Sequence, residues 1–302
     1  MKQPRHEGDI TLADGRTIAY AEFGDPYGMP TFYFHGWPGS RREGALYDDA
    51  ARRHAVRLIA LDRPGYGRST FKRRRTLEQW ADDVAQVATA LQIERFAVAG
   101  LSGGGPYALA CALSMPGRLV ATLVISGEPP QVTKRAPWHR KALAWWSHHT
   151  RFFVRGYFAF VARGVRRNPR LTMALAARSI VFSKRDRALW KRRDLREGFA
   201  ENLRHAFAQG TRALDEDLRL YTQPWGFELE DVRARVHWWH GEDDRIVPMR
   251  HVRQEIVALP DVISSFYPGE GHFMVLDHVD EILRVIAGLQ APPNAPPRTP
   301  SP

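Results

Sequence analysis

Ser102 is the residue best placed to act as a nucleophile. It lies in the stretch GLSGGG, residues 100–105, where Gly100, Ser102 and Gly104 satisfy the pattern G-x-S-x-G. The apolar run 96–101 is typical of a buried strand, and the residues after Ser102 are helix-forming. A serine on such a sharp turn projects its hydroxyl at the carboxyl edge of the sheet. The spacing fits neither the phosphate-binding loop nor the dinucleotide-binding fingerprint, so the sequence favours a nucleophile over a polar loop residue.

Two further side chains could activate this serine. A hydroxyl attacks a carbonyl only when a base accepts its proton, and the base needs an acid that orients it. His272 lies directly after the last predicted strand, and Asp244 follows the apolar run 236–240. We therefore expect both to reach the sheet edge at which Ser102 lies. Glu128, which follows an earlier predicted strand, is the alternative acid.

Acyl transfer also needs two backbone N–H groups that stabilise the oxyanion of the transition state. Gly103, the residue after the nucleophile, is expected to supply one of them. The other is expected from the loop HGWPGS, where Trp37 has an N–H and Pro38 has none. His35 in the same loop is interpreted as a residue that braces the loop rather than a catalytic one.

Strand and helix patterns alternate along much of the chain. The first residues predict an antiparallel hairpin around Asp14 and Gly15. Residues 77–91 have the apolar period of an amphipathic helix, and Thr76 with Gln79 predicts a capping box at its start. Apolar runs that stop at glycine or proline follow such helices, as strands buried on both faces do. The pattern predicts an α/β protein with a parallel sheet covered on both faces.

The alternation is interrupted once. Residues 128–222 are helix-forming, aromatic and basic, and the strand and helix pattern resumes afterwards. We therefore expect a core made of residues 8–127 and 223–288, with 128–222 as a helical insertion. Residues 289–302 are proline-rich and are expected to be a disordered tail.

Composition favours a cytoplasmic protein. Cys111 is the only cysteine, so no internal disulfide can form, which fits a reducing compartment. The first residues lack the apolar region of a signal peptide, and no run approaches the length of a membrane-spanning helix. The oligomeric state cannot be inferred from these features.

The net charge of +11 is concentrated in one segment. Residues 128–222 contain 21 Lys and Arg against 8 Asp and Glu, whereas the rest of the chain contains 23 against 25. This distribution argues against a nucleic-acid-binding protein. The default interpretation is a solvated helix face, as in residues 184–197. Two alternatives stay open, namely arginines that attract an anionic substrate and a segment that touches an acidic membrane surface without stable insertion.

Taken jointly, these motifs resemble the α/β-hydrolase superfamily. The order Ser102, Asp244, His272 and the stretches HGWPGS, DRPGYGRS, GLSGGG and GEGHF carry the resemblance, which covers residues 8–288. It implies an eight-stranded, mostly parallel sheet with a helical cap, residues 128–222, inserted after strand 6. Epoxide hydrolases and haloalkane dehalogenases are similar around HGWPGS but have an aspartate at the position of Ser102. Proline iminopeptidases share a stretch similar to DRPGYGRS, but their oxyanion loop differs at the position of Trp37.

The sequence therefore predicts a serine hydrolase that cleaves a carboxylic ester of a small or medium apolar compound. No cofactor and no metal are expected. Trp138, Trp145 and Phe153 are the candidate substrate-binding residues because they could supply apolar surface to a pocket. Amide cleavage, as in proline iminopeptidases, and carbon-carbon bond hydrolysis are alternatives on the same residues. A ligand receptor without catalytic activity is the alternative from another class.

Overall fold

The structure is built around one eight-stranded sheet with the strand order β1-β2-β4-β3-β5-β6-β7-β8. The computed structural model describes residues 2–131, 138, 142, 145, 149–179 and 181–288. The predicted tail, residues 289–302, lies outside the described residues. The strands are β1 (His6–Thr11), β2 (Thr17–Gly24), β3 (Met29–Phe34), β4 (Val56–Leu61), β5 (Phe96–Leu101), β6 (Leu119–Ile125), β7 (Val236–Gly241) and β8 (Val262–Tyr267).

The sheet is mostly parallel, as predicted. β1 pairs with β2 and β2 with β4 in antiparallel fashion, which confirms the opening hairpin. Every other neighbouring pair is parallel. All six residues of β5 are buried, which explains why this strand is a continuous apolar run rather than an alternating one.

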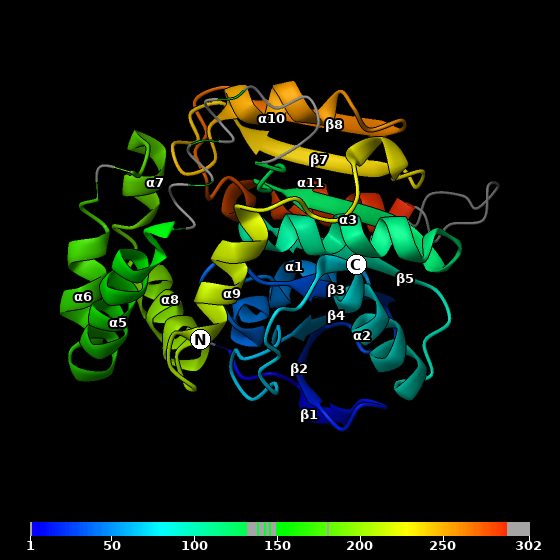
Figure 1. Ribbon diagram of the computed structural model, residues 1–302, viewed down its shortest axis with the longest axis horizontal. Helices are drawn as coiled ribbons and strands as arrows, with labels where there is room; N and C mark the ends of the chain where they lie inside the picture. The colour runs from blue at the N-terminus through cyan, green and yellow to red at the C-terminus, as the bar shows by residue number, and fades with distance from the viewer. Residues whose placement is uncertain are drawn as a thin grey trace, which may run out of the picture.

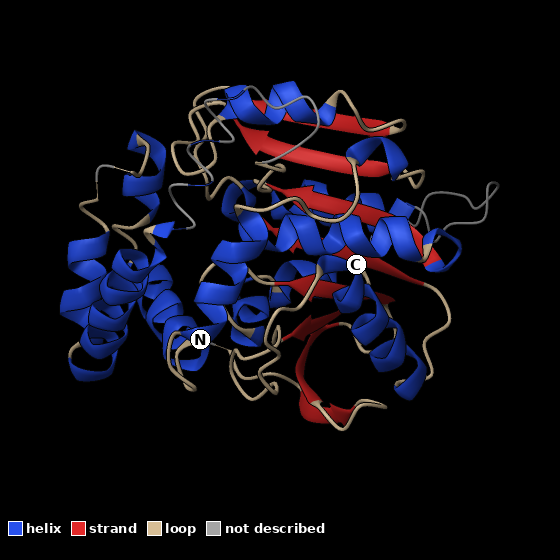
Figure 2. Ribbon diagram, in the orientation of Figure 1, coloured by secondary structure: helices blue, strands red, loops and turns tan. Residues whose placement is uncertain are grey.

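Helices cover both faces of the sheet (Figure 2). Trp80 and Tyr107 belong to one buried cluster, which α2, α3 and α10 form with their face of the sheet. Ala50 and Ile282 belong to the cluster on the other face, formed with α1 and α11. The helices of the two clusters are α1 (Asp48–Arg53), α2 (Leu77–Ala90), α3 (Gly105–Ser114), α10 (Met249–Ile256) and α11 (Val275–Gly288).

Helix α2 shows how the local sequence produces these elements. The Thr76 hydroxyl accepts a hydrogen bond from the Gln79 N–H, and the Gln79 side chain accepts one from Thr76 N–H, so the predicted capping box is present. Trp80 faces the core, where its ring packs edge-on against Phe34 at 5.3 Å and Tyr107 at 5.7 Å between centroids. The apolar stripe of the sequence is thus the face of α2 that covers the sheet.

A helical segment lies between β6 and β7 in the chain, where the insertion was predicted. Figure 1 shows α5 to α8 grouped at the end of the sheet toward which the arrowhead of β7 points. We call these helices, together with α9, the insertion helices. The division of the chain into a core domain and a cap domain stays a prediction. They are α5 (Arg151–Arg167), α6 (Pro169–Ala176), α7 (Lys184–Leu189), α8 (Arg193–Ala206) and α9 (Arg212–Tyr221).

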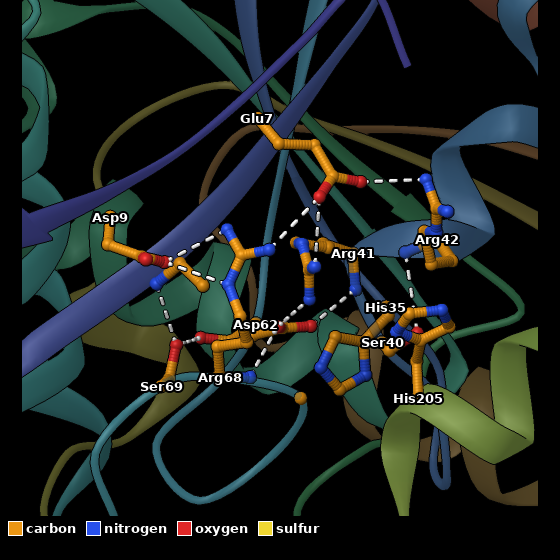
Figure 3. A network of polar contacts seen from close by, with 12 residues as sticks. Glu7, Asp9, His35, Ser40, Arg41, Arg42, Asp62, Arg68, Ser69 and His205 are labelled. Atoms are coloured by element: carbon orange, nitrogen blue, oxygen red, sulfur yellow. Dashed lines mark hydrogen bonds and ion pairs between the residues drawn. The ribbon is translucent and has the colours of Figure 1, made fainter. Parts of the chain in front are cut away.

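An ion-pair network fixes the segment that follows β3 (Figure 3). The Asp62 carboxylate accepts hydrogen bonds from the backbone N–H of Arg41 at 2.7 Å and from its guanidinium at 2.5 Å. The Glu7 carboxylate on β1 contacts Arg41 at 3.2 Å, Arg42 at 2.7 Å and Arg68 at 3.1 Å. These contacts fix the segment immediately after the HGWPGS loop to the edge of the sheet.

A second network, fully buried, joins α9 to the loops at the carboxyl edge of the sheet. The Asp217 carboxylate forms ion pairs with Arg63, at 2.8 Å, and with Arg75. It also accepts hydrogen bonds from the hydroxyls of Tyr66, at 2.8 Å, and Tyr107. Burial favours the neutral acid, but Arg63 and Arg75 outweigh this effect and lower the pKa of Asp217 to about 2.

We expect Asp217→Asn to lower the free energy of unfolding by about 3–5 kcal/mol, because it leaves two buried guanidinium groups without a countercharge. Urea denaturation at neutral pH measures this effect. The stabilisation is complete above the ordinary carboxyl pKa of 3.8 and is lost as the pH falls toward about 2. The control is Asp261→Asn, whose partner Arg235 is 61% exposed, and it should cost under ~1 kcal/mol. An equal loss in the free energy of unfolding for the two variants would contradict a structural role for the buried ion pairs of Asp217.

Candidate functional site

Ser102 lies on a strained turn directly after β5. Its φ is +52°, in the left-handed region that residues with a side chain rarely adopt. A Cβ on Gly100 would lie 2.3 Å from the carbonyl oxygen of Gly104, and a Cβ on Gly104 would lie 2.1 Å from that of Phe34. The turn therefore requires glycine at both positions, which is the strand-to-helix context that the sequence predicted.

Asp244 and His272 are joined by a hydrogen bond. His272 Nδ1 lies 2.7 Å from Asp244 Oδ2, and both side chains are buried. The other carboxylate oxygen accepts hydrogen bonds from the backbone N–H of Ile246 at 2.8 Å and Val247 at 2.9 Å. Burial alone would raise the pKa of Asp244, but the nearby imidazoles of His272 and His240 lower it overall. This carboxylate is held ionised with one oxygen toward His272.

His272 has two further carboxylates in its neighbourhood. Burial lowers the pKa of its imidazole, but the negative charges of Asp244, Asp186 and Glu128 raise it above the ordinary value of 6.5. The carboxylate hydrogen-bonded to His272 is that of Asp244, and its role as the acid stays a prediction. Glu128, the alternative acid, donates its backbone N–H to the Ser102 carbonyl at 3.1 Å, and its carboxylate contacts the side chain of Gln131. Glu128 thus lies beside the nucleophile and acts on His272 through its charge.

No hydrogen bond joins Ser102 Oγ to His272 among the residues that the structure describes. Ser102 is 8% exposed and His272 is 4% exposed, so both lie at the limit of solvent access. In enzymes without substrate, the contact between nucleophile and base is often long and closes only in the complex. The two residues therefore have the burial and the sheet-edge positions that the chemistry requires.

Asp186 binds the loop that carries His272, and the sequence did not reveal this. Its carboxylate accepts a hydrogen bond from the Phe273 N–H at 3.0 Å. A Cβ on Gly271 would lie 2.2 Å from Ser183 Oγ and 2.3 Å from Asp186 Oδ2, so only glycine allows this approach. The prediction of a solvated face for residues 184–197 is wrong at Asp186, which is fully buried because it caps α7 and binds this loop.

The two expected oxyanion donors lie next to each other. A Cβ on Gly103 would be 2.7 Å from Trp37 Cβ and 2.5 Å from Tyr221 Oη. The Tyr221 hydroxyl donates a hydrogen bond to the Gly103 carbonyl at 2.8 Å. Tyr221 is the last residue of α9, so an insertion helix supports the backbone at the nucleophile.

Buried polar groups of Arg63 and His35 form hydrogen bonds that fix the HGWPGS loop. The Arg63 guanidinium donates hydrogen bonds to the carbonyls of His35 and, at 3.3 Å, Gly36. His35 Nδ1 donates to the Gly36 carbonyl at 2.9 Å, and Nε2 accepts from the Arg63 N–H at 3.3 Å. Burial and the charge of Arg63 hold the pKa of His35 well below its ordinary value, so the ring is neutral. The predicted bracing role of His35 is confirmed.

A carboxylate and an amide brace the same loop from the other side. The Glu43 carboxylate accepts hydrogen bonds from the Gly36 N–H at 3.1 Å and the Tyr33 hydroxyl at 2.6 Å. Asn202 on α8 donates to Glu43 at 2.9 Å and accepts from the Ser40 N–H at 2.8 Å. The loop is thus fixed between the sheet and the insertion helices.

The three aromatic residues predicted to line the pocket receive no support. Trp138, Trp145 and Phe153 are 79%, 62% and 67% exposed, which is not the burial of a pocket lining. Phe158, five residues beyond Phe153 and on another side of α5, instead packs against Trp37 with 5.1 Å between ring centroids. The sequence could not distinguish these aromatic residues, because which face of α5 turns inward depends on tertiary packing.

The described residues contain no group of three or more His, Cys, Asp or Glu side chains arranged to hold a metal ion. The groups gathered at the carboxyl edge of the sheet are instead a hydroxyl, an imidazole, a carboxylate and backbone N–H donors. Such a set is suited to acyl transfer, in which a proton moves between a nucleophile and a base.

Parts of the chain are similar to known enzymes. A non-heme chloroperoxidase from Streptomyces lividans is 34% identical over 129 residues, 42% of this chain and 47% of the relative. A probable proline iminopeptidase from Streptomyces coelicolor is 33% identical over 135 residues, 41% of each chain. The aligned region thus spans less than half the length of either relative.

Similarity to solved structures extends over nearly the whole chain. An esterase from Exiguobacterium antarcticum superimposes with a TM-score of 0.67 at 17% identity, over 95% of this chain and 100% of the esterase. At this identity the match shows the fold alone. The model of the alpha/beta hydrolase family matches residues 32–285. With the family's sheet order and strand-to-helix turn both present, the chain belongs to the alpha/beta hydrolase family.

Proposed function

We propose that this protein is a serine hydrolase that cleaves a carboxylic ester through an acyl-enzyme. The observation that carries the proposal is the buried Asp244 and His272 pair, held at the sheet edge that also presents Ser102 on a strained turn. A carboxylate that orients an imidazole, at the same sheet edge as a serine on a sharp turn, is the arrangement that nucleophilic acyl transfer requires.

The reaction runs in two halves. Ser102 Oγ attacks the carbonyl carbon while His272 Nε2 accepts the hydroxyl proton, and the negative charge moves to the carbonyl oxygen. The tetrahedral intermediate collapses, the bond to the alcohol oxygen breaks, and His272 returns the proton to the leaving alcohol. Water then attacks the acyl-enzyme with His272 as the base, which releases the acid and restores Ser102.

The charges around His272 suit it to this task. The backbone N–H groups of Trp37 and Gly103 are the oxyanion donors in this proposal, and they lie on adjacent segments. Asp244 stabilises the imidazolium that forms during attack, and it stays ionised because its pKa is lowered. Because the pKa of His272 is raised, its neutral imidazole is a stronger base toward the Ser102 proton. A larger fraction of the imidazole is protonated near neutral pH than in an isolated histidine.

The groups beside the nucleophile favour an apolar substrate of small or medium size. Trp37, Phe158 and Tyr221 form aromatic contacts next to Gly103, with 5.1 Å between the first two rings and 6.0 Å between Trp37 and Tyr221. Ester cleavage is proposed from these apolar groups and the site residues, whereas the partial match to the iminopeptidase favours an amide substrate. Rates on p-nitrophenyl butyrate and on prolyl p-nitroanilide decide between them, and a faster anilide reaction would overturn ester specificity.

We expect Ser102→Ala to lower kcat/KM for p-nitrophenyl butyrate by about 10⁴-fold or more, because no other group can form the acyl-enzyme. The same substitution should abolish labelling by a fluorophosphonate probe. The control is Ser264→Ala, an exposed serine on β8, which should keep both activity and label. A folded wild-type protein that the probe does not label would instead support the ligand receptor.

The pH profile should reveal the carboxylates around His272. Activity requires the neutral imidazole, so kcat/KM should fall as the pH drops through the raised pKa of His272. Asp186→Asn removes a negative charge but keeps an oxygen that can accept from the Phe273 N–H, so the acid limb should move to lower pH with little loss of the plateau rate.

Two variants make this result specific. Asp186→Ala loses the acceptor as well as the charge, so the plateau rate should also fall. Asp261→Asn removes a charge at a distant, exposed ion pair and should leave the profile unchanged. An acid limb that stays in place in Asp186→Asn would show that this carboxylate does not influence the base.

A further inference from the structure

Helix α5 carries an aromatic face that points to solvent. Phe152, Tyr157 and Phe160 are 60%, 61% and 74% exposed, and Phe153 beside them is 67% exposed. Exposed fractions this large are uncommon for several neighbouring aromatic side chains on one helix. We call Phe152, Tyr157 and Phe160 the outer face of α5.

The outer face is not needed to hold α5 in place. The opposite side of the helix supplies its packing, because Phe158 contacts Trp37 and Phe207 and both Ala162 and Val165 are buried. The helix therefore has one apolar side that packs on the described part of the protein and a second, at Phe152, Tyr157 and Phe160, that is mostly exposed. An apolar surface with no packing role is typical of an interaction site.

The surroundings of the outer face are strongly positive. The described residues 149–179 and 181–185 contain nine Lys and Arg and no Asp or Glu. Arg155, Arg163 and Arg166 lie on α5 itself and are exposed. Aromatic side chains interleaved with arginines are the composition of helices that rest in the headgroup region of a membrane.

We propose that the outer face of α5 docks on an anionic lipid surface. The aromatic rings would enter the boundary between headgroups and acyl chains, and the arginines would bind lipid phosphates. No helix in the described part of the chain is long and apolar enough to span a bilayer, so the contact is peripheral.

Charge also decides against a second copy of this chain as the occupant. In a symmetric dimer the same face would meet itself, which would bring together two described segments with nine cations each and no carboxylates. A lipid surface instead supplies a dense layer of negative charge and an apolar layer beneath it, which match both features of α5.

Docking of this kind would place α5, which contacts the candidate active site, at the membrane. The inner side of α5 touches Trp37 in the HGWPGS loop, so only the helix itself, about 10 Å across, separates the lipid from that loop. The proposal does not depend on ester chemistry, because a catalytically inactive protein would bind in the same way.

Co-sedimentation of the full chain with vesicles tests the proposal. We expect binding to phosphatidylcholine vesicles that contain about one third phosphatidylglycerol, and at least about tenfold weaker binding to phosphatidylcholine alone. Raising the salt from ~0.1 M to ~1 M should weaken the binding, because it screens the arginines. The triple variant Phe152→Ser, Tyr157→Ser, Phe160→Ser should lose at least about tenfold in vesicle affinity.

A matched triple variant controls for the loss of apolar surface in general. Tyr27, Val257 and Ile263 are 96%, 75% and 48% exposed and lie outside the insertion helices, so Tyr27→Ser, Val257→Ser, Ile263→Ser should bind vesicles normally. Both variants should keep the thermal midpoint of the wild type. The proposal would be overturned if the wild-type protein did not bind the anionic vesicles, or if the α5 variant bound them as tightly as the wild type. It would also be overturned if the wild type were a dimer that the α5 substitutions dissociate.

Discussion

The carboxylate of Asp217 is the charge on which the geometry of the candidate site depends. It is buried at the end of the sheet, where it neutralises Arg63 and Arg75. Arg63 in turn holds the carbonyls of His35 and Gly36, so the loop before Trp37 is set by a guanidinium that is buried only because its countercharge is present. Removing this charge would leave cations in the interior, and the loop would lose its support.

The insertion helices also support the loops of the candidate site. Asn202 on α8 bonds to Ser40 in the HGWPGS loop, and Tyr221 on α9 bonds to the carbonyl of Gly103. Asp186 on α7 bonds to the N–H that follows His272. Each of these loops follows a strand of the sheet and is also hydrogen-bonded to one of these helices. Movement of the helices would therefore change the catalytic geometry as well as access to it.

The sequence predicts that Ser102, Asp244 and His272 lie at one edge of the sheet, because in a parallel sheet polar residues directly after buried strands gather there. Their catalytic roles stay a proposal. The sequence was not sufficient to find Asp186 or Asp217. Both lie in charged helices whose composition is typical of a solvated surface, and only tertiary packing buries one carboxylate among many exposed charges.

The same limit applies to the aromatic residues of the insertion. An apolar period shows that a helix has an apolar side, but α5 has aromatic residues on two sides. Phe158 turns inward to Trp37, whereas Phe153 turns to solvent, and the two are five positions apart. The choice between them depends on how α5 packs on the sheet edge, which the sequence alone does not specify.

Mass spectrometry of the acid-quenched protein during turnover of p-nitrophenyl butyrate tests the acyl-enzyme most directly. We expect the protein to gain the mass of one butyryl group and the peptide containing Ser102 to carry it. Turnover without an adduct on that peptide, or with the acyl group on another residue, would rule out Ser102 as the nucleophile.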